Sequence, residues 1–278
     1  MKQLNNLSFE LFPPKTEEGM ENMQAAVAEL TAAKPDYFSV TFGAGGSTRD
    51  RTFATVDWLM GQGIDAAPHI SCIGASREEM AALLARYREK GVKRLVALRG
   101  DLPSGAGSSA LGDLHYANEL VSFIREDSGD HFQVEVAAYP EVHPQAKNAR
   151  ADLENFKRKV DAGADGAITQ YFFNAEAYFR FVEECQGLGV EIAIIPGIMP
   201  VTNYSQLARF SDACGADIPR WMRKRLEGFG DDLESIRAFG EEVVTRLCQE
   251  LVDGGAPGLH FYTMNRSTAT LKVLSNLT

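Results

Sequence analysis

The sequence predicts an α/β protein, a single (β/α)8 TIM barrel with extra helices before the last strand. Short apolar runs rich in β-branched and aromatic residues alternate with longer segments of helical period along the whole chain. The length of 278 residues suits one such barrel. The alternative is an open, doubly wound sheet, which should carry a glycine-rich motif after its first strand. Phe12, Pro13 and Pro14 stand there instead, so closure into a barrel is favoured.

Eight segments are predicted as strands because each is a short apolar run between polar or turn-forming residues. They are 7–11, 36–42, 65–70, 93–98, 133–139, 166–171, 191–195 and 258–262. Eight strands that alternate with helices indicate a parallel sheet closed on itself.

The segments between the strands have helical periodicity. The clearest is 76–90, where Ser76 and Glu79 have the spacing of a capping box and Gly91 follows the last turn. The other predicted helices are 114–125, 146–162, 175–187, 204–214, 218–229, 233–252 and 267–277. Two of them, 218–229 and 233–252, form the insert before the last strand.

The composition is that of an ordinary globular protein, with 45% hydrophobic and 24% charged residues. Because the formal net charge is -10, general binding of nucleic acid or anionic membrane is disfavoured. The N-terminus lacks the apolar segment of a secretory signal, and no apolar run approaches the length of a membrane span. The four cysteines include no C-x-x-C pair, which favours free thiols and a cytoplasmic location.

Barrel enzymes place their active sites at the C-terminal ends of the strands. In this sequence polar groups or glycines stand at or just after nearly every predicted strand end: Glu10, Thr41, His69, Arg99, Gly100, Asp101, Tyr139, Glu141, His143, Gln170, Gly197, Tyr262, Asn265 and Arg266. Random surface chemistry would not produce such an arrangement, so we expect the functional site at this rim.

Glu10 is the strongest single candidate. Inside a barrel it would be desolvated, which favours the protonated form that a general acid needs. His69 fits a site residue and a satisfied core histidine equally well, and His143 fits a site residue and a turn residue equally well. Asp101 is either a cap or, because it follows Arg99 and Gly100 at a strand end, a site residue; the second reading is favoured. Cys72 is expected to serve packing.

Several other chemistries have little support. No lysine stands at the C-terminal end of a predicted strand, which disfavours a Schiff-base aldolase. The rim shows no tight spacing of metal ligands, so no metal is predicted. The P-loop pattern that nucleotide hydrolysis requires is missing from the sequence.

The predicted helix 146–162 carries a polar stripe made of Asp152, Asn155, Arg158 and Lys159. A carboxylate, an amide and two cations are suited to hold a ribose and a pyrophosphate. On spacing alone, a solvated, salt-bridged face is the favoured explanation.

Seven blocks of the sequence resemble bacterial methylenetetrahydrofolate reductases, in family order across nearly the whole chain. They are SFELFPP at 8–14, SVTFGA at 39–44, ALRGDLP at 97–103, AYPEVHP at 138–144, KRKVDAGA at 157–164, TQYFF at 169–173 and HFYTMNR at 260–266. Each block alone is weak, but their combination is highly specific. The resemblance implies a barrel that binds FAD without a covalent link.

The resemblance also implies the site residues. It assigns the general acid to Glu10 and a second catalytic role to Asp101. The cofactor-binding positions it implies are Thr41, His69, Leu98, Arg99, Gly100, Asp101, Tyr116, Ala117, Ala137, Tyr139, His143, Asp152, Asn155, Arg158 and Lys159. The implied folate-binding positions are Glu10, Asp101, Gln170, Gln206, Phe210, Tyr262 and Arg266. This assignment reverses the favoured explanation of the stripe on 146–162.

The activity implied is a ping-pong reduction of 5,10-methylenetetrahydrofolate to 5-methyltetrahydrofolate, with NADH or NADPH as hydride donor, feeding methionine synthesis. The choice of nicotinamide stays open, although bacterial relatives favour NADH. A homo-oligomer is expected, because such relatives are often tetramers. The chain ends soon after the eighth strand, so a single catalytic domain over 1–278 without the adenosylmethionine-binding regulatory domain of eukaryotic relatives is expected. The glycine-rich loop 105–112 is a candidate lid.

Two rival functions remain at this point. The first is a flavin-free methyltransferase with a similar folate pocket, which would be colourless. The second is a non-catalytic barrel that binds a ligand and a partner protein. Neither explains the stripe from Asp152 to Lys159 as well as FAD does.

Overall fold

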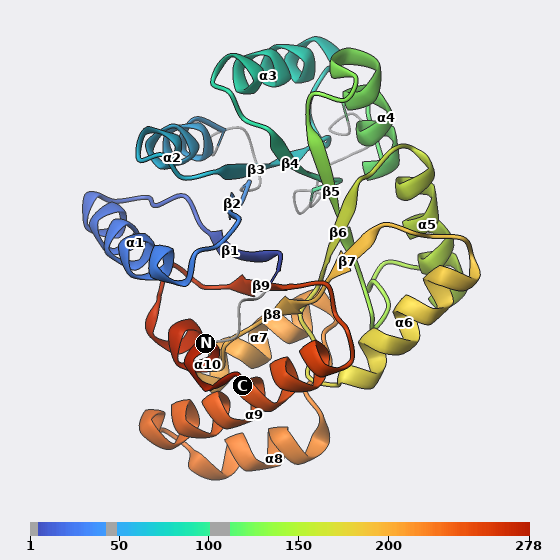
Figure 1. The fold of residues 1–278 in the computed structure, drawn as a ribbon. Helices are drawn as coiled ribbons and strands as arrows, with labels where there is room; N and C mark the ends of the chain where they lie inside the picture. Colours follow the sequence, from blue (N-terminus) through green and yellow to red (C-terminus); the bar gives the residue numbers. More distant parts are fainter. Residues whose placement is uncertain (1–4, 43–48, 101–111) are drawn as a thin grey trace.

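Nine parallel strands form one sheet in the order β7-β6-β5-β4-β3-β2-β1-β9-β8, and helices surround it (Figure 1). The structure is a computed structural model that describes residues 5–42, 49–100 and 112–278. The predicted site residue Asp101 and nearly all of the candidate lid 105–112 lie outside the described residues. The strands are β1 (Leu7–Leu11), β2 (Tyr37–Val40), β3 (Ala66–Ser71), β4 (Arg94–Leu98), β5 (Gln133–Ala138), β6 (Gly166–Thr169), β7 (Ala193–Ile195), β8 (Gly197–Ile198) and β9 (Leu259–Tyr262).

The ring is closed by a strand that is interrupted at Pro196. β7 pairs with β6, and β8, one residue further along the chain, pairs with β9. Proline has no N–H to donate, but its carbonyl accepts a hydrogen bond from the backbone of His260 at 3.0 Å. The barrel prediction is therefore confirmed. The single strand expected over 191–195 is corrected to two short strands on either side of the proline.

Ten α-helices and one short 3-10 helix (Thr31–Ala33) appear in the described part of the chain. The α-helices are given next. They are α1 (Glu17–Leu30), α2 (Arg49–Gly61), α3 (Arg77–Glu89), α4 (Ala117–Ser128), α5 (Ala149–Asp161), α6 (Ala175–Gly187), α7 (Tyr204–Cys214), α8 (Arg220–Phe229), α9 (Leu233–Asp253) and α10 (Thr268–Asn276). The predicted capping box is present, with the side chains of Ser76 and Glu79 each accepting from the other's backbone. The insert before the last strand is also present, as α8 and α9.

Two predicted helix starts were too early. Helix α4 begins at Ala117 rather than at 114, because the backbone N–H of His115 is bonded to the Glu119 carboxylate at 2.7 Å and lies outside the helical ladder. Helix α5 begins at Ala149 rather than at 146, because the Asn148 side chain accepts from the Ala151 backbone at 2.9 Å and caps the helix there.

Successive side chains along each strand point to opposite faces of the sheet, so the strands contribute to two separate apolar regions. One set of side chains, which includes Phe9, Phe38 and Phe261, belongs to the main core between sheet and helices. The other set points into the barrel, where Tyr37 and Ile168 belong to a smaller cluster. The inward set is continuous in register across the sheet, and it fixes which polar residues meet inside the barrel.

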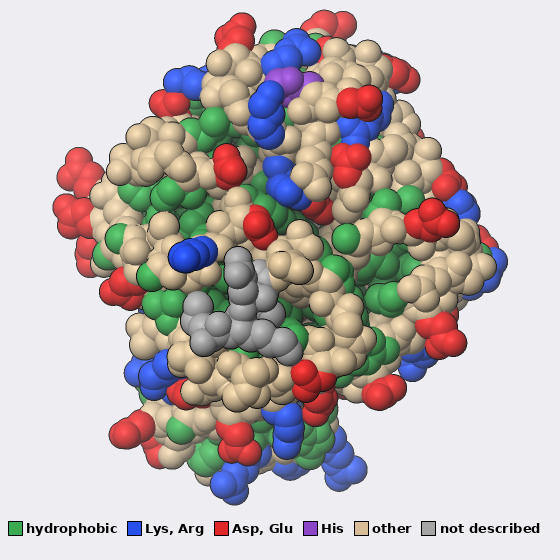
Figure 2. All heavy atoms as spheres, viewed as in Figure 1, with side chains coloured by type: hydrophobic (Ala, Val, Ile, Leu, Met, Phe, Trp, Pro, Cys, Tyr) green, Lys and Arg blue, Asp and Glu red, His purple; other side chains and the backbone are tan. Residues whose placement is uncertain are grey.

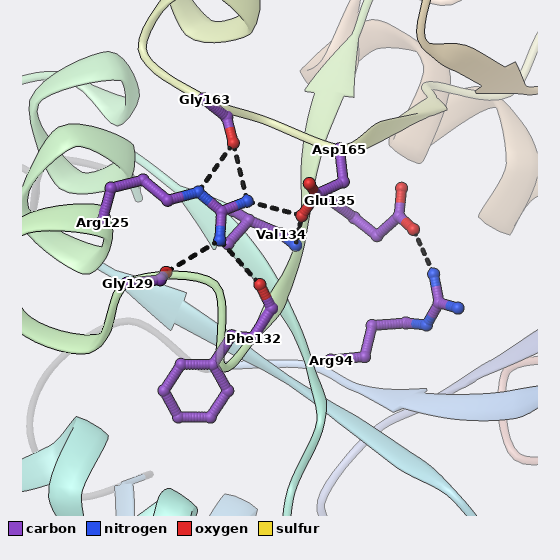
Figure 3. A network of polar contacts seen from close by, with 8 residues as sticks. All are labelled: Arg94, Arg125, Gly129, Phe132, Val134, Glu135, Gly163 and Asp165. Atoms are coloured by element: carbon purple, nitrogen blue, oxygen red, sulfur yellow. Dashed lines mark hydrogen bonds and ion pairs between the residues drawn. The ribbon is translucent and has the colours of Figure 1, made fainter.

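The N-terminal end of the barrel interior is filled by charged residues in contact. Arg94, at the start of β4, forms an ion pair with Glu135 of β5 (Figure 3). The Arg94 guanidinium also lies over the Tyr37 ring, 4.4 Å from the ring centroid. Burial raises the pKa of Glu135, and Arg94 opposes that shift. Gly166 stands opposite Glu135, because a Cβ there would meet a carboxylate oxygen at 2.2 Å.

A second arginine forms hydrogen bonds with the segments that precede β5 and β6 near this end of the barrel. Arg125 of α4 donates to the carbonyls of Gly163 and Phe132 and pairs with Asp165 (Figure 3). Asp165 in turn accepts from the Val134 backbone at 2.6 Å. The segments that lead into β5 and β6 are thereby held against α4.

The outer surface carries charges of both signs. Figure 2 shows Lys and Arg side chains interspersed with Asp and Glu on the face viewed, without a large area of one sign. None of the helices in the described ranges is long and apolar enough to cross a membrane.

Candidate active site

Glu10 lies inside the barrel near the C-terminal end of β1, with 7% of its surface exposed. Its Oε2 atom is 3.5 Å from Nε2 of His69 on β3 and 3.8 Å from Nε2 of His260 on β9. Both distances exceed those of a good hydrogen bond. The Thr263 hydroxyl donates to the Glu10 carbonyl at 2.6 Å and fixes the backbone of β1 here. The result is a buried carboxyl group that faces two imidazoles without being locked by either.

His69 is held in its neutral form. Burial lowers the pKa of His69 to about 4, although the nearby Glu10 opposes the shift. Of the two readings open from the sequence, the structure places His69 beside the proposed acid rather than in the apolar core. A neutral imidazole can donate or accept one hydrogen bond at the nitrogen that faces Glu10.

Ser8 and His260 are two site residues to which the sequence analysis gave no role. The Ser8 hydroxyl lies 2.8 Å from Nδ1 of His260, and both side chains are buried. The register of β1 on β9 pairs Ser8 with His260 and Glu10 with Tyr262. The available signal was the period of two: each of these residues stands two positions before one of the predicted site residues and so shares its face.

Tyr262, two residues after His260 on β9, lies between Glu10 and the end of β6. Its hydroxyl donates to the Thr169 carbonyl at 2.7 Å, and its ring occupies the space that a Cβ on Gly197 would need. Burial raises the pKa of Tyr262 well above its usual value, and Glu10 adds to that shift. The ring therefore stays neutral and serves as part of the wall beside Glu10.

The remaining predicted folate residues lie on three separate segments. Gln170 follows β6, and its side chain accepts from the Tyr171 backbone at 3.0 Å. Gln206 and Phe210 lie on α7, half-buried. The hydroxyls of Tyr171 and Ser211 are 3.0 Å apart, which joins α7 to the end of β6.

Arg266 is exposed just after β9, beyond Asn265. The Asn265 side chain exchanges two hydrogen bonds of 2.8 Å with the Phe12 backbone. The segment that carries Arg266 is thereby fastened to the segment that follows Glu10.

The predicted cofactor residues after β4 and β5 form one connected group. Arg99 donates to the Gln145 side chain, and Tyr139 lies edge-on to His143 with ring centroids 4.5 Å apart. The His143 backbone donates to the Asp152 carboxylate at 2.8 Å. The end of β4, the loop after β5 and the first turn of α5 are therefore held together at the rim.

The stripe on α5 differs from an ordinary solvated face. The salt bridges with helical spacing on α5 join Arg150 to Glu154 and Lys157 to Asp161, which are not stripe residues. Lys159 instead turns inward and donates to the Ala137 carbonyl. Burial lowers the pKa of Lys159 to about 8, and Asp152 opposes the shift. Such a desolvated cation suits contact with an anion better than contact with water.

Gly100 allows the backbone to pass close to β3. It has a φ of +88°, and a Cβ there would meet the Ser71 hydroxyl at 1.9 Å. That hydroxyl donates to the Arg99 carbonyl at 2.8 Å. The rim segment before residue 101 is therefore fixed at a position that only glycine permits.

The other predicted cofactor residues lie at the ends of elements. Thr41 follows β2, and its N–H donates to the Leu11 carbonyl at 2.9 Å. Leu98 ends β4 and packs against the inner cluster. Tyr116, 58% exposed, precedes Ala117 at the start of α4. An exposed aromatic ring next to a polar rim is suited to contact a bound ring system.

Comparison with known proteins gives a consistent match. A family model described as methylenetetrahydrofolate reductase matches residues 2–278. The 5,10-methylenetetrahydrofolate reductase of Escherichia coli strain K12 is 41% identical over 273 residues, which cover 98% of this chain and 90% of that protein. Methylenetetrahydrofolate reductase (NADH) 1 of Arabidopsis thaliana is 35% identical over 282 residues, which cover 97% of this chain and 48% of that protein.

A solved structure supports the fold independently. It is an uncharacterized protein from Clostridium thermocellum that is described as binding two copies of 5-methyl-5,6,7,8-tetrahydrofolic acid. The TM-score is 0.69 over 98% of this chain and 94% of that one. At 17% sequence identity this likeness shows the fold alone.

Proposed function

Because the chain belongs to the methylenetetrahydrofolate reductase family, we propose that it reduces 5,10-methylenetetrahydrofolate to 5-methyltetrahydrofolate and so feeds methionine synthesis. The hydride comes from a reduced nicotinamide through bound FAD, in two half-reactions that use the same site in turn. The family match extends over residues 2–278, so it includes every strand that contributes to the site. The observation that carries the proposal is the position of Glu10: a buried acid at the rim of the barrel.

The described residues fit a flavin dinucleotide. Asp152 and Asn155 supply a carboxylate and an amide suited to ribose hydroxyls, and Arg158 and Lys159 supply cations suited to a diphosphate. The half-buried amino group of Lys159 supports this fit, because an ammonium has three N–H donors and the Ala137 carbonyl accepts only one of them. When bound, FAD supplies the two-electron chemistry that protein side chains lack.

Glu10 is proposed to act as the general acid. In its protonated form it gives a proton to a nitrogen of the bridging ring of the folate, which helps that ring to open. The neutral His69 next to it stabilises the carboxyl group without adding a fixed positive charge. The hydrogen bond from the Tyr262 hydroxyl to the Thr169 carbonyl holds the Tyr262 ring beside the acid, where we propose that it limits the access of water.

Folate recognition is proposed for residues on both sides of Glu10. Gln170 offers an amide at the end of β6, and Phe210 and Gln206 offer an aromatic ring and an amide from α7. Asp101 and Arg266 complete the proposed set. The folate-binding description of the Clostridium thermocellum protein is in keeping with a folate site in this fold.

NADH is proposed as the physiological donor, and the names of the plant relatives support that choice. A cytoplasmic homo-oligomer is proposed as the working form. Light scattering on the purified protein measures the oligomeric state directly.

The experiment that tests the function is a visible absorption spectrum of the purified protein under anaerobic conditions. We expect flavin bands that bleach on addition of NADH and return on addition of methylenetetrahydrofolate. A colourless protein that fails to take up added FAD would contradict the proposal and favour a flavin-free folate methyltransferase. Bleaching by NADPH but not by NADH would overturn only the choice of donor.

A further inference from the structure

We propose that Ser8 and His260 form a tautomer switch, which supports the buried Glu10 in both its ionised and its protonated form. The inference rests on the proposed function of Glu10 as an acid that gains and loses a proton in each cycle. It assigns a positioning role to two residues that do not themselves contact the rim.

The geometry isolates the His260 ring from solvent and places one polar side chain near each of its nitrogens. His260 has 0% of its surface exposed, and Nδ1 is 2.8 Å from the Ser8 hydroxyl. Its other nitrogen, Nε2, has no hydrogen-bond partner among the described residues and lies 3.8 Å from Oε2 of Glu10. Such a distance closes to a hydrogen bond with a small rotation of the carboxyl group.

A neutral imidazole has one N–H and one lone pair, and a serine hydroxyl can donate or accept. When Glu10 is ionised, Nε2–H donates to it, and the Ser8 hydroxyl donates to Nδ1. When Glu10 is protonated, its O–H donates to Nε2, and Nδ1–H donates to the Ser8 oxygen. The Glu10 carboxyl group, both nitrogens of His260 and the Ser8 hydroxyl each have a partner in both arrangements.

The two arrangements differ by the single proton that Glu10 gives to the folate. The imidazole and the hydroxyl each keep one proton, and only the position of that proton changes. A lysine in place of His260 would favour the ionised carboxylate alone, and an apolar residue would favour the protonated form alone. The His260 ring can donate a hydrogen bond to the ionised Glu10 or accept one from the protonated Glu10. It therefore suits an acid that must use both forms.

The charges around this group come from several strands. On β3 the neutral His69 faces the same Glu10 oxygen at 3.5 Å, and on β9 the neutral Tyr262 packs edge-on against the His260 ring. On β2 the Tyr37 side chain is hydrogen-bonded with Ser8, and burial raises the pKa of Tyr37 well above its usual value, so it stays neutral. On β5 Glu135 interacts electrostatically with His260, and Arg94 of β4 is paired with Glu135.

The direct test is a nitrogen-15 NMR spectrum of the histidine side chains as a function of pH. The chain has only five histidines, and a His260→Asn variant assigns the signals of His260. We expect the Nε2–H tautomer where Glu10 is ionised and the Nδ1–H tautomer where Glu10 is protonated. One tautomer at every pH, or a doubly protonated ring at neutral pH, would overturn the proposal.

The kinetic test uses Ser8→Ala. Without the hydroxyl, Nδ1 loses its partner in both tautomers, but a buried N–H without an acceptor costs more than a lone pair without a donor. The ring is therefore held as Nε2–H and favours the ionised Glu10. We expect the pH profile of the folate half-reaction to move to lower pH, and its rate at neutral pH to fall by up to about tenfold, the equivalent of one lost hydrogen bond. The nicotinamide half-reaction should be unchanged, and Ser8→Thr should restore the profile.

Thr270→Val is the matched control. Thr270 is a buried residue of helix α10, outside the sheet, and its hydroxyl has no hydrogen-bond partner in the described part of the chain. If Ser8→Ala and Thr270→Val show the same pH profile, the switch is wrong. A wild-type protein that fails to reduce methylenetetrahydrofolate would refute the proposed function instead, and the NMR titration would still test the switch.

Discussion

The two ends of the barrel interior hold a buried carboxylate in different ways. At the N-terminal end, Glu135 is in contact with the Arg94 guanidinium, which also stacks on Tyr37. At the C-terminal end, Glu10 faces two imidazoles at 3.5 and 3.8 Å, and no Lys or Arg of the described residues pairs with it.

The difference indicates that the carboxylate at the N-terminal end contributes to stability and that the carboxyl group at the C-terminal end contributes to function. A buried carboxylate in contact with a cation depends on that partner, because removal of the cation leaves a buried charge without compensation. A carboxyl group that faces two imidazoles at 3.5 and 3.8 Å is not held by a cation and can exchange a proton. The four predictions below test this division between the two ends.

The largest effect is expected for Glu10→Gln. The folate half-reaction should slow by about 10²–10⁴-fold, because the proton donor is lost. Bleaching of the flavin by NADH should persist, and urea denaturation should show no loss of stability. Stopped-flow absorbance measures both half-reactions, and normal folate turnover by this variant would refute the role of Glu10.

Arg94→Met should show the opposite pattern. The free energy of unfolding should fall by about 3 kcal/mol, because Glu135 is left buried without its partner. The folded fraction should keep both half-reactions. Replacing the pair together, as Arg94→Met with Glu135→Leu, should recover most of the stability in urea denaturation, and an equally unstable double variant would argue against the pair as the cause.

The pH dependence of stability should report on His69. The pKa of His69 is about 4 in the folded protein, below its usual value, so the unfolded chain binds this proton more readily. Stability is therefore complete above pH ~6.5 and falls by roughly 3 kcal/mol as the pH drops toward 4. His69→Gln should flatten this slope in urea denaturation series, whereas a variant of the exposed His115 should retain it.

The smallest effect is expected for two glycine substitutions. Gly166→Ala places a Cβ 2.2 Å from a Glu135 oxygen and should destabilise the protein by about 1–3 kcal/mol. Gly61, the last residue of α2, has open space around its Cβ position. Gly61→Ala should be neutral or stabilising by up to about 1 kcal/mol, and thermal denaturation of both variants tests the contrast.

Much of the fold follows from local sequence. The alternation of apolar runs with helical segments predicts the barrel, because such runs have few other ways to be buried. Helix starts were predicted well at Ser76 and less well at 114 and 146. The side chains that set those two starts, Glu119 and Asn148, are also local signals, but the apolar periodicity runs past them toward the N-terminus. The interruption at Pro196 depends on which strands pair on either side, which is not local information.

The site was predictable to a different extent. Glu10 stands out because a carboxylate in an apolar strand is rare, and the stripe on α5 stands out by spacing together with the family resemblance. The pair of Ser8 and His260 did not, because its two members are separated by 252 positions and meet only through the register of β1 on β9. A period of two indicates which residues share a face of each strand, but not which strands become neighbours.

The pairing of β1 with β9 also has a consequence for how the protein folds during its synthesis. This pairing joins residues 7–10 to residues 259–262, so it forms only after the chain as far as residue 262 has left the ribosome. On its other side β9 is held by β8, which is two residues long. Because His260 and Tyr262 arrive with β9, a nascent or prematurely released chain that lacks this strand presents Glu10 beside His69 but without His260 and Tyr262. Synthesis of the final strand is thus the step at which the acid acquires its working environment.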